Sequence, residues 1–255
     1  MEKLPVSLVV ITLNEEKNIE RCLKSAPWVS EAVVVDSGSQ DKTLALAQTL
    51  GAKTVVEPFR GFREQKEFAT SLAKHDWVLS LDADEALSPE LSEKLRQMFL
   101  LGTIENLDGV ETPRLSFHLG RWVRHGGWFP DWQLRFFHRS RCRWVGGHVH
   151  ERVAGTKIER VQEHIQHWVF QDLFDQVDTN NDYSSRGAKD LLDQGKRFSL
   201  LKLVLKPCSK FMETYFWKRG FLDGLPGFII SVGAAYSVFL KFSKLWELEK
   251  NRKAK

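Results

Sequence analysis

The chain has 255 residues, of which 42% are apolar and 27% are charged, and this composition excludes both a disordered chain and a protein that is fully embedded in a membrane. Its length predicts one catalytic domain with an appended C-terminal region. The formal net charge is +4, but the basic residues concentrate at residues 114–160 and again after residue 196, which favours anionic partners such as phosphates or lipid headgroups.

The spacing of the cysteines and the N-terminal segment predict that the protein is located in the cytoplasm, a reducing compartment. Cys22, Cys142 and Cys208 are widely scattered, and they show neither the close pairing of a zinc motif nor the even count of a disulfide framework. The apolar run at residues 4–13 ends at Asn14 without the small-residue cleavage site of a signal peptide. We therefore expect this run to be a buried strand.

Strands and helices alternate over residues 6–101. The apolar runs and the intervening periodic segments predict strands at residues 6–13, 32–35, 53–56 and 77–81, and helices at residues 14–23, 42–50, 61–73 and 88–101. Such alternation implies a parallel sheet that is covered on both faces, with ligands at the carboxyl ends of its strands. Asp36, Asp82 and Asp84 all fall at such ends.

The second part of the chain differs from the first in pattern. Residues 109–167 form short, aromatic-rich and basic segments, which predict smaller strands and loops that complete the domain. We therefore predict a first domain at residues 1–170, with one half at 1–108 and the other at 109–170, followed by a helical region at 171–255.

The predicted helical region carries lysines among many large apolar side chains. Its longest uncharged stretch, residues 224–240, contains Pro226 and is shorter than the roughly 20 residues that a spanning helix needs. We expect an interfacial or shallowly inserted helical region. The alternative is a pair of helices that packs on the catalytic core.

The segment Asp82-Ala83-Asp84 directly follows a predicted buried strand. Two carboxylates separated by one residue can hold a hard divalent cation that bridges a diphosphate, and Mg²⁺ or Mn²⁺ suits such oxygen ligands. A cation at this place stabilises the charge that develops on a departing nucleoside diphosphate. Taken alone, the tripeptide is also typical of a solvated acidic run that caps a helix.

Two further segments accompany this tripeptide at ordinary spacing. They are Val-Val-Ile-Thr-Leu-Asn-Glu-Glu at residues 9–16 and Val-Val-Val-Asp-Ser-Gly-Ser-Gln-Asp-Lys-Thr at residues 33–43. As a set, the three segments resemble glycosyltransferase family 2, the inverting enzymes of the nucleotide-diphospho-sugar transferase (GT-A) fold, over residues 5–150. The resemblance implies an α/β catalytic domain with a mostly parallel central sheet flanked by helices. It also implies that residues 1–108 are the nucleotide-sugar half of this domain and residues 109–170 the acceptor half.

The same resemblance implies a nucleotide-sugar site at the edge of that sheet. Thr12, Asn14 and Glu15 are expected to line the nucleoside pocket, Asp36 to accept a hydrogen bond from the base, and Asp41 to fix the turn that follows, a role compatible with capping a helix. The full implied set comprises Thr12, Asn14, Glu15, Asp36, Ser37, Gln65, Lys66, Asp82, Ala83 and Arg135. The implied metal ligands are Asp82, Asp84 and His150.

A narrower resemblance covers nearly the whole chain. The segments at residues 60–69, 131–137, 147–151, 220–224 and 241–248 resemble those of the lipopolysaccharide core β-1,4-glucosyltransferases of the WaaE/KdtX type. This resemblance implies transfer of glucose from UDP-glucose to a heptose of the lipid-anchored inner core. It also implies that Gln65 and Lys66 lie near the diphosphate, with exposed positions on a helix as the alternative.

An inverting displacement needs a carboxylate that takes the proton from the acceptor hydroxyl. Asp131, four residues before Arg135, resembles the acidic base of the family, although Pro130 stands where the family usually has glutamate. Glu151 follows two histidines on a strand-like segment and is the second candidate. Both are predicted as catalytic residues, and the sequence leaves the choice open.

Basic residues and histidines gather in the second half of the predicted domain. Arg135 and the arginines at alternate positions of residues 139–143 are predicted to clamp phosphates, because guanidinium groups match phosphate geometry, with a solvated strand face as the alternative. His148 and His150 share one face of a predicted strand. Because no cysteine lies nearby, a zinc site is disfavoured, and we expect a single histidine to reach the divalent cation or the diphosphate.

Other functions stay open at this point. A polyprenyl-phosphate sugar transferase has an acceptor that is already an anion and needs no base, and a non-catalytic module could bind sugar nucleotides or membranes as a scaffold. Nucleic-acid binding is disfavoured because the basic residues form no single helix face or recognition motif. The leading interpretation has three partners: a UDP-sugar donor, a lipid-linked saccharide acceptor and the inner-membrane surface, to which the protein attaches peripherally from the cytoplasm.

Overall fold

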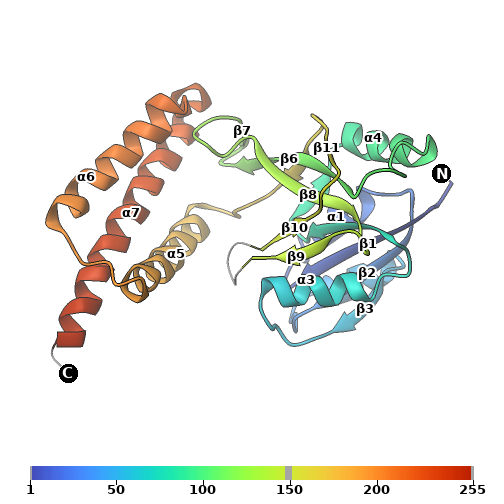
Figure 1. Cartoon of the computed structure of the whole chain (residues 1–255), viewed down its shortest axis with the longest axis horizontal. Helices are drawn as coiled ribbons and strands as arrows, with labels where there is room; N and C mark the ends of the chain where they lie inside the picture. Colours follow the sequence, from blue (N-terminus) through green and yellow to red (C-terminus); the bar gives the residue numbers. More distant parts are fainter. Residues whose placement is uncertain (1, 147–150, 254–255) are drawn as a thin grey trace. The chain divides into compact units, whose positions relative to one another are not determined.

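The structure, a computed structural model, describes residues 2–146 and 151–253. It contains two compact units, each with its own core (Figure 1). Unit 1 comprises Met1–Arg114 and Asp131–His167, and unit 2 comprises Leu115–Pro130 and Trp168–Lys255. The predicted α/β architecture describes unit 1, and the predicted helical region makes up most of unit 2.

The loop segment Leu115–Pro130 belongs to unit 2, although we expected it in the acceptor half of the catalytic domain. It is tied there by Asp223, a buried carboxylate that accepts hydrogen bonds from the backbone N–H groups of Arg124 (3.1 Å) and His125 (2.8 Å). The predicted boundary at residue 170 lies close to Trp168, where unit 2 resumes.

Unit 1 is built on a mixed sheet with strand order β3-β2-β1-β4-β8-β6-β12-β5, and β11 pairs with β6. Its strands are β1 (Leu4–Thr12), β2 (Val29–Asp36), β3 (Lys53–Val56), β4 (Trp77–Asp82), β5 (Glu85–Leu87), β6 (Gly109–His118), β8 (Asp131–His138), β11 (Ile158–Arg160) and β12 (Ile165–His167). The first four strands are parallel, as predicted. The later strand β8 runs antiparallel to both β4 and β6, whereas β11 pairs with β6 in parallel. Strands β9 (Arg143–Val145) and β10 (Arg152–Ala154) form a separate antiparallel pair.

Helices cover the sheet because their apolar positions recur with helical spacing. The helices of unit 1 are α1 (Ile19–Lys24), α2 (Thr43–Thr49), α3 (Phe62–Ser71) and α4 (Pro89–Leu100). The hydroxyl of Ser88 caps α4 by accepting from the N–H of Leu91 at 3.1 Å. The predicted start of the first helix at residue 14 is wrong, because Asn14 adopts a φ of 55° and the helix begins at Ile19.

The register of the parallel strands brings three carboxyl ends together. Thr12 lies opposite Asp36, and Ile11 lies opposite Asp82. The strands themselves are fixed by burial, since Val6, Leu8 and Val10 are almost completely inaccessible and a shift of one residue would turn them to the other face. The predicted gathering of acidic residues at one edge of the sheet is thereby confirmed.

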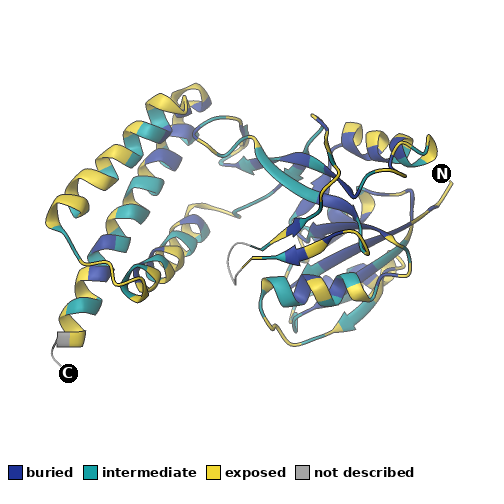
Figure 2. Ribbon diagram, in the orientation of Figure 1, coloured by how far each residue is buried: buried dark blue, intermediate teal, exposed yellow. Residues whose placement is uncertain are grey.

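Unit 2 is helical apart from the short strand β7 (Arg121–Val123), which pairs with the end of β6. Its elements are α5 (Leu173–Asp193), α6 (Leu200–Phe211), the π-helical turn η1 (Met212–Trp217), the 3₁₀ turn η2 (Gly220–Asp223) and α7 (Gly224–Lys253). The long helix α7 packs against both α5 and α6, around a core that includes Ala188, Phe242 and Leu245. Figure 2 shows many exposed positions along α6 and α7.

Candidate active site

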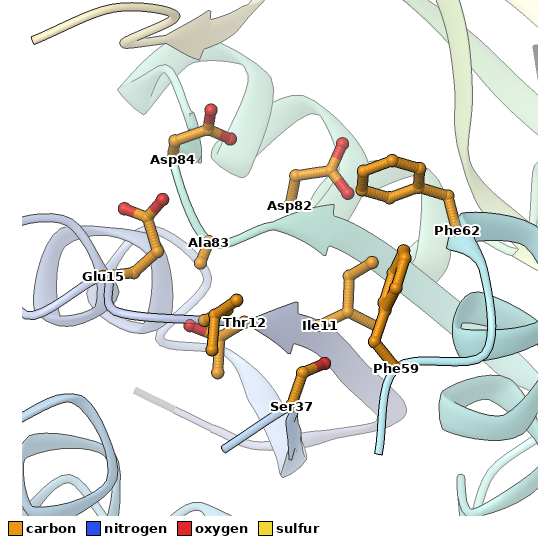
Figure 3. Close-up of a pocket in the computed structure, with 10 residues that line it drawn as sticks. Ile11, Thr12, Glu15, Ser37, Phe59, Phe62, Asp82, Ala83 and Asp84 are labelled. Atoms are coloured by element: carbon orange, nitrogen blue, oxygen red, sulfur yellow. The ribbon is translucent and has the colours of Figure 1, made fainter. Parts of the chain in front are cut away.

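A cavity of about 370 Å³ opens at the carboxyl edge of β1, β2 and β4 in unit 1. This volume falls within the range of small-ligand sites, about 300–1,000 Å³. Figure 3 shows the rings of Phe59 and Phe62 on one side and the carboxylates of Glu15 and Asp84 on another. The cavity is lined by Ile11, Thr12, Leu13, Glu15, Ser37, Phe59, Phe62, Asp82, Ala83 and Asp84.

The turn after β2 is built around Asp36, which is fully buried. Its Oδ2 accepts hydrogen bonds from the backbone N–H groups of Gly38 (2.9 Å) and Ser39 (2.8 Å), and its Oδ1 accepts from the Ser39 hydroxyl. Gly38 adopts a φ of 105°, which glycine tolerates best. Asp36 therefore shapes the cavity wall, and its expected contact with a nucleobase stays a prediction.

A second set of hydrogen bonds joins this turn to the loop after β1. Asn14 accepts from the N–H of Gln40 at 2.8 Å through its side chain and donates its own N–H to the Ser39 hydroxyl at 2.8 Å. Asp41 accepts from the N–H of Thr43 at 2.9 Å, and hydrogen bonds from Thr43 outweigh the opposing effect of burial and lower the pKa of Asp41. Asp41 therefore fixes the turn in which it lies.

Two residues expected at the nucleotide are positioned by these loops. The buried hydroxyl of Thr12 lines the cavity and has no hydrogen-bond partner in the described part of the chain, so it is available to a ligand. Gln65 is fully buried and donates to the carbonyl of Glu57 at 3.0 Å and to the Ser37 hydroxyl at 3.4 Å. Gln65 thus supports the wall that carries Ser37.

Asp82 is held between two buried cations. Lys66 Nζ lies 2.8 Å from its Oδ1, and Arg135 Nη2 lies 2.6 Å from its Oδ2. Burial alone would raise the pKa of Asp82, but Arg135 and then Lys66 hold the pKa of this carboxyl well below its usual range. Lys66 and Arg135 are both buried. Lys66 is therefore not an exposed residue of a helix, and Arg135 does not lie on a solvated strand face.

The ion pairs continue through two residues that sequence reasoning did not identify. Glu85, buried on β5, accepts from Nη2 of Arg135 and from Nη1 of Arg114, both at 2.8 Å. Arg114 in turn donates to Oδ2 of Asp131 through both Nε (2.9 Å) and Nη2 (2.7 Å). A chain of opposite charges therefore connects Asp82 with Asp131 inside unit 1.

The two candidate bases differ in exposure and in partner. The side chain of Asp131 is 40% exposed and its Oδ1 accepts from Nε2 of Gln133 at 2.9 Å. The side chain of Glu151 is 14% exposed and its Oε1 lies 3.0 Å from Nζ of Lys66. Asp131 is thus the more accessible carboxylate.

Comparison with known proteins decides the family of the chain. Residues 7–166, more than half of the chain, match the profile of the family described as Glycosyl transferase family 2. The chain belongs to glycosyltransferase family 2. The predicted family and its GT-A fold are confirmed by this match together with the sheet described above.

Relatives of this glycosyltransferase cover most of its length. It is 34% identical over 260 residues to an uncharacterized glycosyltransferase of Rickettsia felis, with 97% of this chain and 90% of the relative covered. It is 31% identical over 258 residues to the lipopolysaccharide core biosynthesis glycosyltransferase LpsC of Rhizobium meliloti, with 96% of this chain and 93% of the relative covered.

Solved structures match a smaller part of the glycosyltransferase. Glucosyl-3-phosphoglycerate synthase from Mycobacterium tuberculosis, in complex with Mn²⁺, uridine diphosphate and glucosyl-3-phosphoglycerate, is 28% identical with a TM-score of 0.34. The match covers 44% of this chain and 43% of the synthase. The glycosyltransferase therefore spans less than half of that solved structure.

The cation site expected in the glycosyltransferase centres on Asp84. Its Oδ2 lies 3.2 Å from Nε2 of His167, and the carboxylate borders the cavity. Within residues 2–146 and 151–253, no group of three or more histidine, cysteine or acidic side chains could hold a metal ion by itself. Mg²⁺ and Mn²⁺ bind through one or two carboxylates, with phosphates and waters completing the shell, so Asp84 with Asp82 fits such an ion.

The histidines and arginines predicted to contact the cation or the phosphates have different outcomes. His148 and His150, the histidines expected near the cation, fall outside the described residues. Among the described residues, His167, which we did not single out, lies beside Asp84. Two of the arginines after Arg135 have structural partners: Nε of Arg139 lies 3.3 Å from Oδ1 of Asp76, and Arg141 donates to the carbonyl of Leu107 at 2.9 Å.

Proposed function

We propose that this glycosyltransferase is an inverting enzyme that transfers a hexose from a nucleoside diphosphate sugar, with UDP-glucose as the expected donor. The acceptor is a hydroxyl of a lipid-linked saccharide, namely a heptose of the lipopolysaccharide inner core. The relative LpsC, a lipopolysaccharide core biosynthesis glycosyltransferase, supports this acceptor class. The observation that carries the proposal is the cavity bordered by Thr12, Ser37 and both carboxylates of Asp82-Ala83-Asp84.

The donor binds in this cavity. The rings of Phe59 and Phe62, 5.0 Å apart in an edge-to-face arrangement, offer an apolar wall to a nucleobase, and the free hydroxyl of Thr12 offers a hydrogen bond. Asp84, with Asp82, would hold Mg²⁺ or Mn²⁺. Such a cation would offset the negative charge of the departing nucleoside diphosphate.

Lys66 and Arg135 keep the site electrostatically balanced before the donor arrives. Each contacts one oxygen of the half-buried Asp82, so this carboxylate is compensated without a metal ion. Because Asp82 lines the cavity, the two cations add positive charge beside it that attracts a diphosphate, and guanidinium groups suit phosphate oxygens.

Asp131 acts as the general base, and Arg114 positions it. Nε and Nη2 of Arg114 both donate to Oδ2 of Asp131, which fixes the carboxylate and leaves Oδ1, whose described partner is Gln133, to face the acceptor. Glu151 is the weaker candidate because it is less exposed and pairs with Lys66. The proton of the acceptor hydroxyl passes to Asp131 as the hydroxyl oxygen attacks the anomeric carbon from the face opposite the leaving diphosphate.

The acceptor places the enzyme at the cytoplasmic face of the inner membrane, to which it attaches peripherally through unit 2. One helical segment, Gly220–Arg252, is long and apolar enough to cross a membrane by length and composition alone. Attachment rather than crossing fits the lysines and arginines that surround the apolar side chains of this region.

The proposal is tested with the purified full-length chain and a panel of UDP- and GDP-sugars. We expect release of UDP from UDP-glucose, dependent on Mg²⁺ or Mn²⁺ and abolished by EDTA. With lipopolysaccharide inner-core acceptor, UDP release should accelerate and a β-linked product should form. If the protein neither binds nor turns over any nucleotide sugar, the proposal is wrong and a scaffold function remains. If the protein transfers sugar to polyprenyl phosphate and Asp131→Asn keeps this activity, the acceptor is a phosphate and not a hydroxyl.

A further inference from the structure

Helix α6 exposes an apolar row to solvent. Leu201, Val204 and Leu205 have exposed fractions of 67%, 56% and 54%, and Cys208 is also exposed. Met212, the first residue of η1, continues the row and is 54% exposed. Their spacing places them on one side of the helix. The half-buried side chains of α6, including Leu203, belong to the contact with α7. The exposed row is therefore unpartnered in this unit.

A basic row accompanies the apolar row of α6. Lys202, Lys206 and Lys210 recur every four residues, and α6 contains no acidic residue. Lys210 pairs with Glu213 at 3.1 Å, whereas neither Lys202 nor Lys206 forms an ion pair with a described side chain. Two uncompensated cations thus lie beside exposed leucine and valine side chains.

The turn after α6 and the outer side of α7 extend this surface. Trp217 in η1 is 88% exposed and is followed by Lys218 and Arg219. Along α7, large apolar side chains recur every three, four or seven residues and remain exposed. They are Leu225, Phe228, Val232, Tyr236, Phe239 and Trp246.

Contacts with α5 argue against a membrane-spanning α7. Nζ of Lys244 donates to Oδ1 of Asn181 at 2.6 Å and to the hydroxyls of Ser184 at 2.8 Å and Ser185 at 2.7 Å. Nearer the start of α7, Gly233 lies against the Gln176 amide of α5. If α7 crossed a bilayer, these polar and acidic turns of α5 would be carried into hydrocarbon, which is costly.

We infer that α6, η1 and the outer side of α7 dock onto one leaflet of an anionic lipid bilayer, with α7 lying along the interface. The apolar rows enter the boundary between headgroups and acyl chains, and the lysines contact anionic headgroups. The inference rests on the proposed function only in that a lipid-linked acceptor gives the docked enzyme its substrate. We call the row Leu201, Val204, Leu205, Cys208 and Met212 the docking row.

The native thiol of Cys208 reports on docking. Of the three cysteines it alone is exposed, while Cys22 and Cys142 are buried. A polarity-sensitive fluorophore on Cys208 should shift to the blue and resist aqueous quencher when phosphatidylglycerol vesicles are added at low salt. Pure phosphatidylcholine vesicles should give a much smaller shift. An unchanged spectrum with anionic vesicles, or a shift that depends on protein concentration without vesicles, overturns the inference.

Vesicle flotation with variants separates the apolar and electrostatic contributions. Val204→Glu with Leu205→Glu should lower affinity for anionic vesicles by more than about tenfold, and Lys202→Gln with Lys206→Gln by about thirtyfold. Leu101→Glu, the same change at a 73% exposed leucine of unit 1, is the matched control and should float like the parent. If the variants of α6 float with anionic vesicles as well as the parent and Leu101→Glu do, α6 is not part of the docking surface.

Two more readouts complete the test. Alkaline carbonate should extract the protein from membranes, whereas retention after this treatment indicates a spanning helix and overturns the interfacial arrangement. UDP release from UDP-glucose, measured without vesicles on the same preparations, should survive Val204→Glu with Leu205→Glu. If the protein binds vesicles but releases no UDP, the proposed function is refuted and the docking surface stands. If it releases UDP but does not bind vesicles, the docking surface alone is refuted.

Discussion

Replacing Glu85 by glutamine tests the buried ion-pair chain of unit 1. Oε1 of Glu85 accepts from Arg114 and Arg135, both at 2.8 Å, and Oε2 accepts from the N–H of Asp82 at 3.0 Å. All three partners are donors. An amide offers only one oxygen, so whichever way the introduced side chain turns, its NH₂ group faces a donor.

The expected loss in the free energy of unfolding of Glu85→Gln follows from the burial of Glu85 and Arg135. The side chain of Glu85 is completely inaccessible and that of Arg135 is 5% exposed, so the variant leaves buried cations without part of their compensation. Removal of one partner from a buried ion pair costs about 3–5 kcal/mol. The amide has nearly the same volume as the carboxylate, so no cavity adds to this cost. We expect a loss of this size in the free energy of unfolding of unit 1 at pH 7.

The loss should depend on pH in a defined direction. Burial raises the pKa of Glu85, but Arg135 and Arg114 outweigh burial and the nearby Asp82, so the folded pKa lies below the usual value of 4.5. The contribution of Glu85 to stability is therefore complete above pH 4.5 and declines as the pH falls through the folded pKa. The difference between parent and variant should shrink below pH 4.5.

Urea unfolding followed by circular dichroism and tryptophan fluorescence measures this difference. Glu93→Gln is the matched control, because Glu93 is 52% exposed and pairs with Arg96 at 3.0 Å on α4, and an exposed pair contributes about 0–1 kcal/mol. A loss for Glu85→Gln no larger than for Glu93→Gln, or a difference that persists unchanged at low pH, refutes the assigned role of Glu85.

Further predictions concern the base and the core. Asp131→Asn should lower transfer to a saccharide acceptor by about a hundredfold or more and leave UDP binding, measured by calorimetry, unchanged; a parallel loss of UDP binding contradicts the assignment. Arg114→Gln should lower transfer more than it lowers UDP binding, with partial recovery in Arg114→Lys, whereas equal losses in both assays would show a purely structural effect. Leu95→Ala, which truncates a fully buried side chain of α4, should cost about 2–5 kcal/mol in thermal or urea unfolding, and a cost under about 1 kcal/mol would contradict the packing described.

Much of the parallel half of unit 1 was predictable because its signals are local. Apolar runs marked β1, β2 and β4 and placed Asp36 at the end of β2 and Asp82 at the end of β4. The parallel register then brought both residues to one edge of the sheet. The glycine-containing turn after β2 was likewise visible in sequence, since Gly38 occupies a positive φ.

The ion-pair chain could not be predicted in the same way. Glu85 meets Arg114 across 29 positions and Asp82 meets Arg135 across 53, and these contacts depend on which strands become neighbours in the sheet. Arg114, a charged residue flanked by Pro113 and Leu115 on β6, was the one available signal. The start of the first helix was misplaced because Asn14 uses its side chain to hold the neighbouring turn rather than to begin a helix.

The central claim is that Asp84 holds a divalent cation through which the nucleotide binds. Isothermal titration calorimetry of UDP against the full-length protein, with and without Mn²⁺, tests it most directly. We expect Mn²⁺ to strengthen UDP binding by about tenfold or more, on the order of one to two charge-assisted contacts, and Asp84→Asn to remove this gain while the fold, followed by circular dichroism, is kept. Equal UDP affinity with and without Mn²⁺, or an undiminished Mn²⁺ effect in Asp84→Asn, would contradict the account.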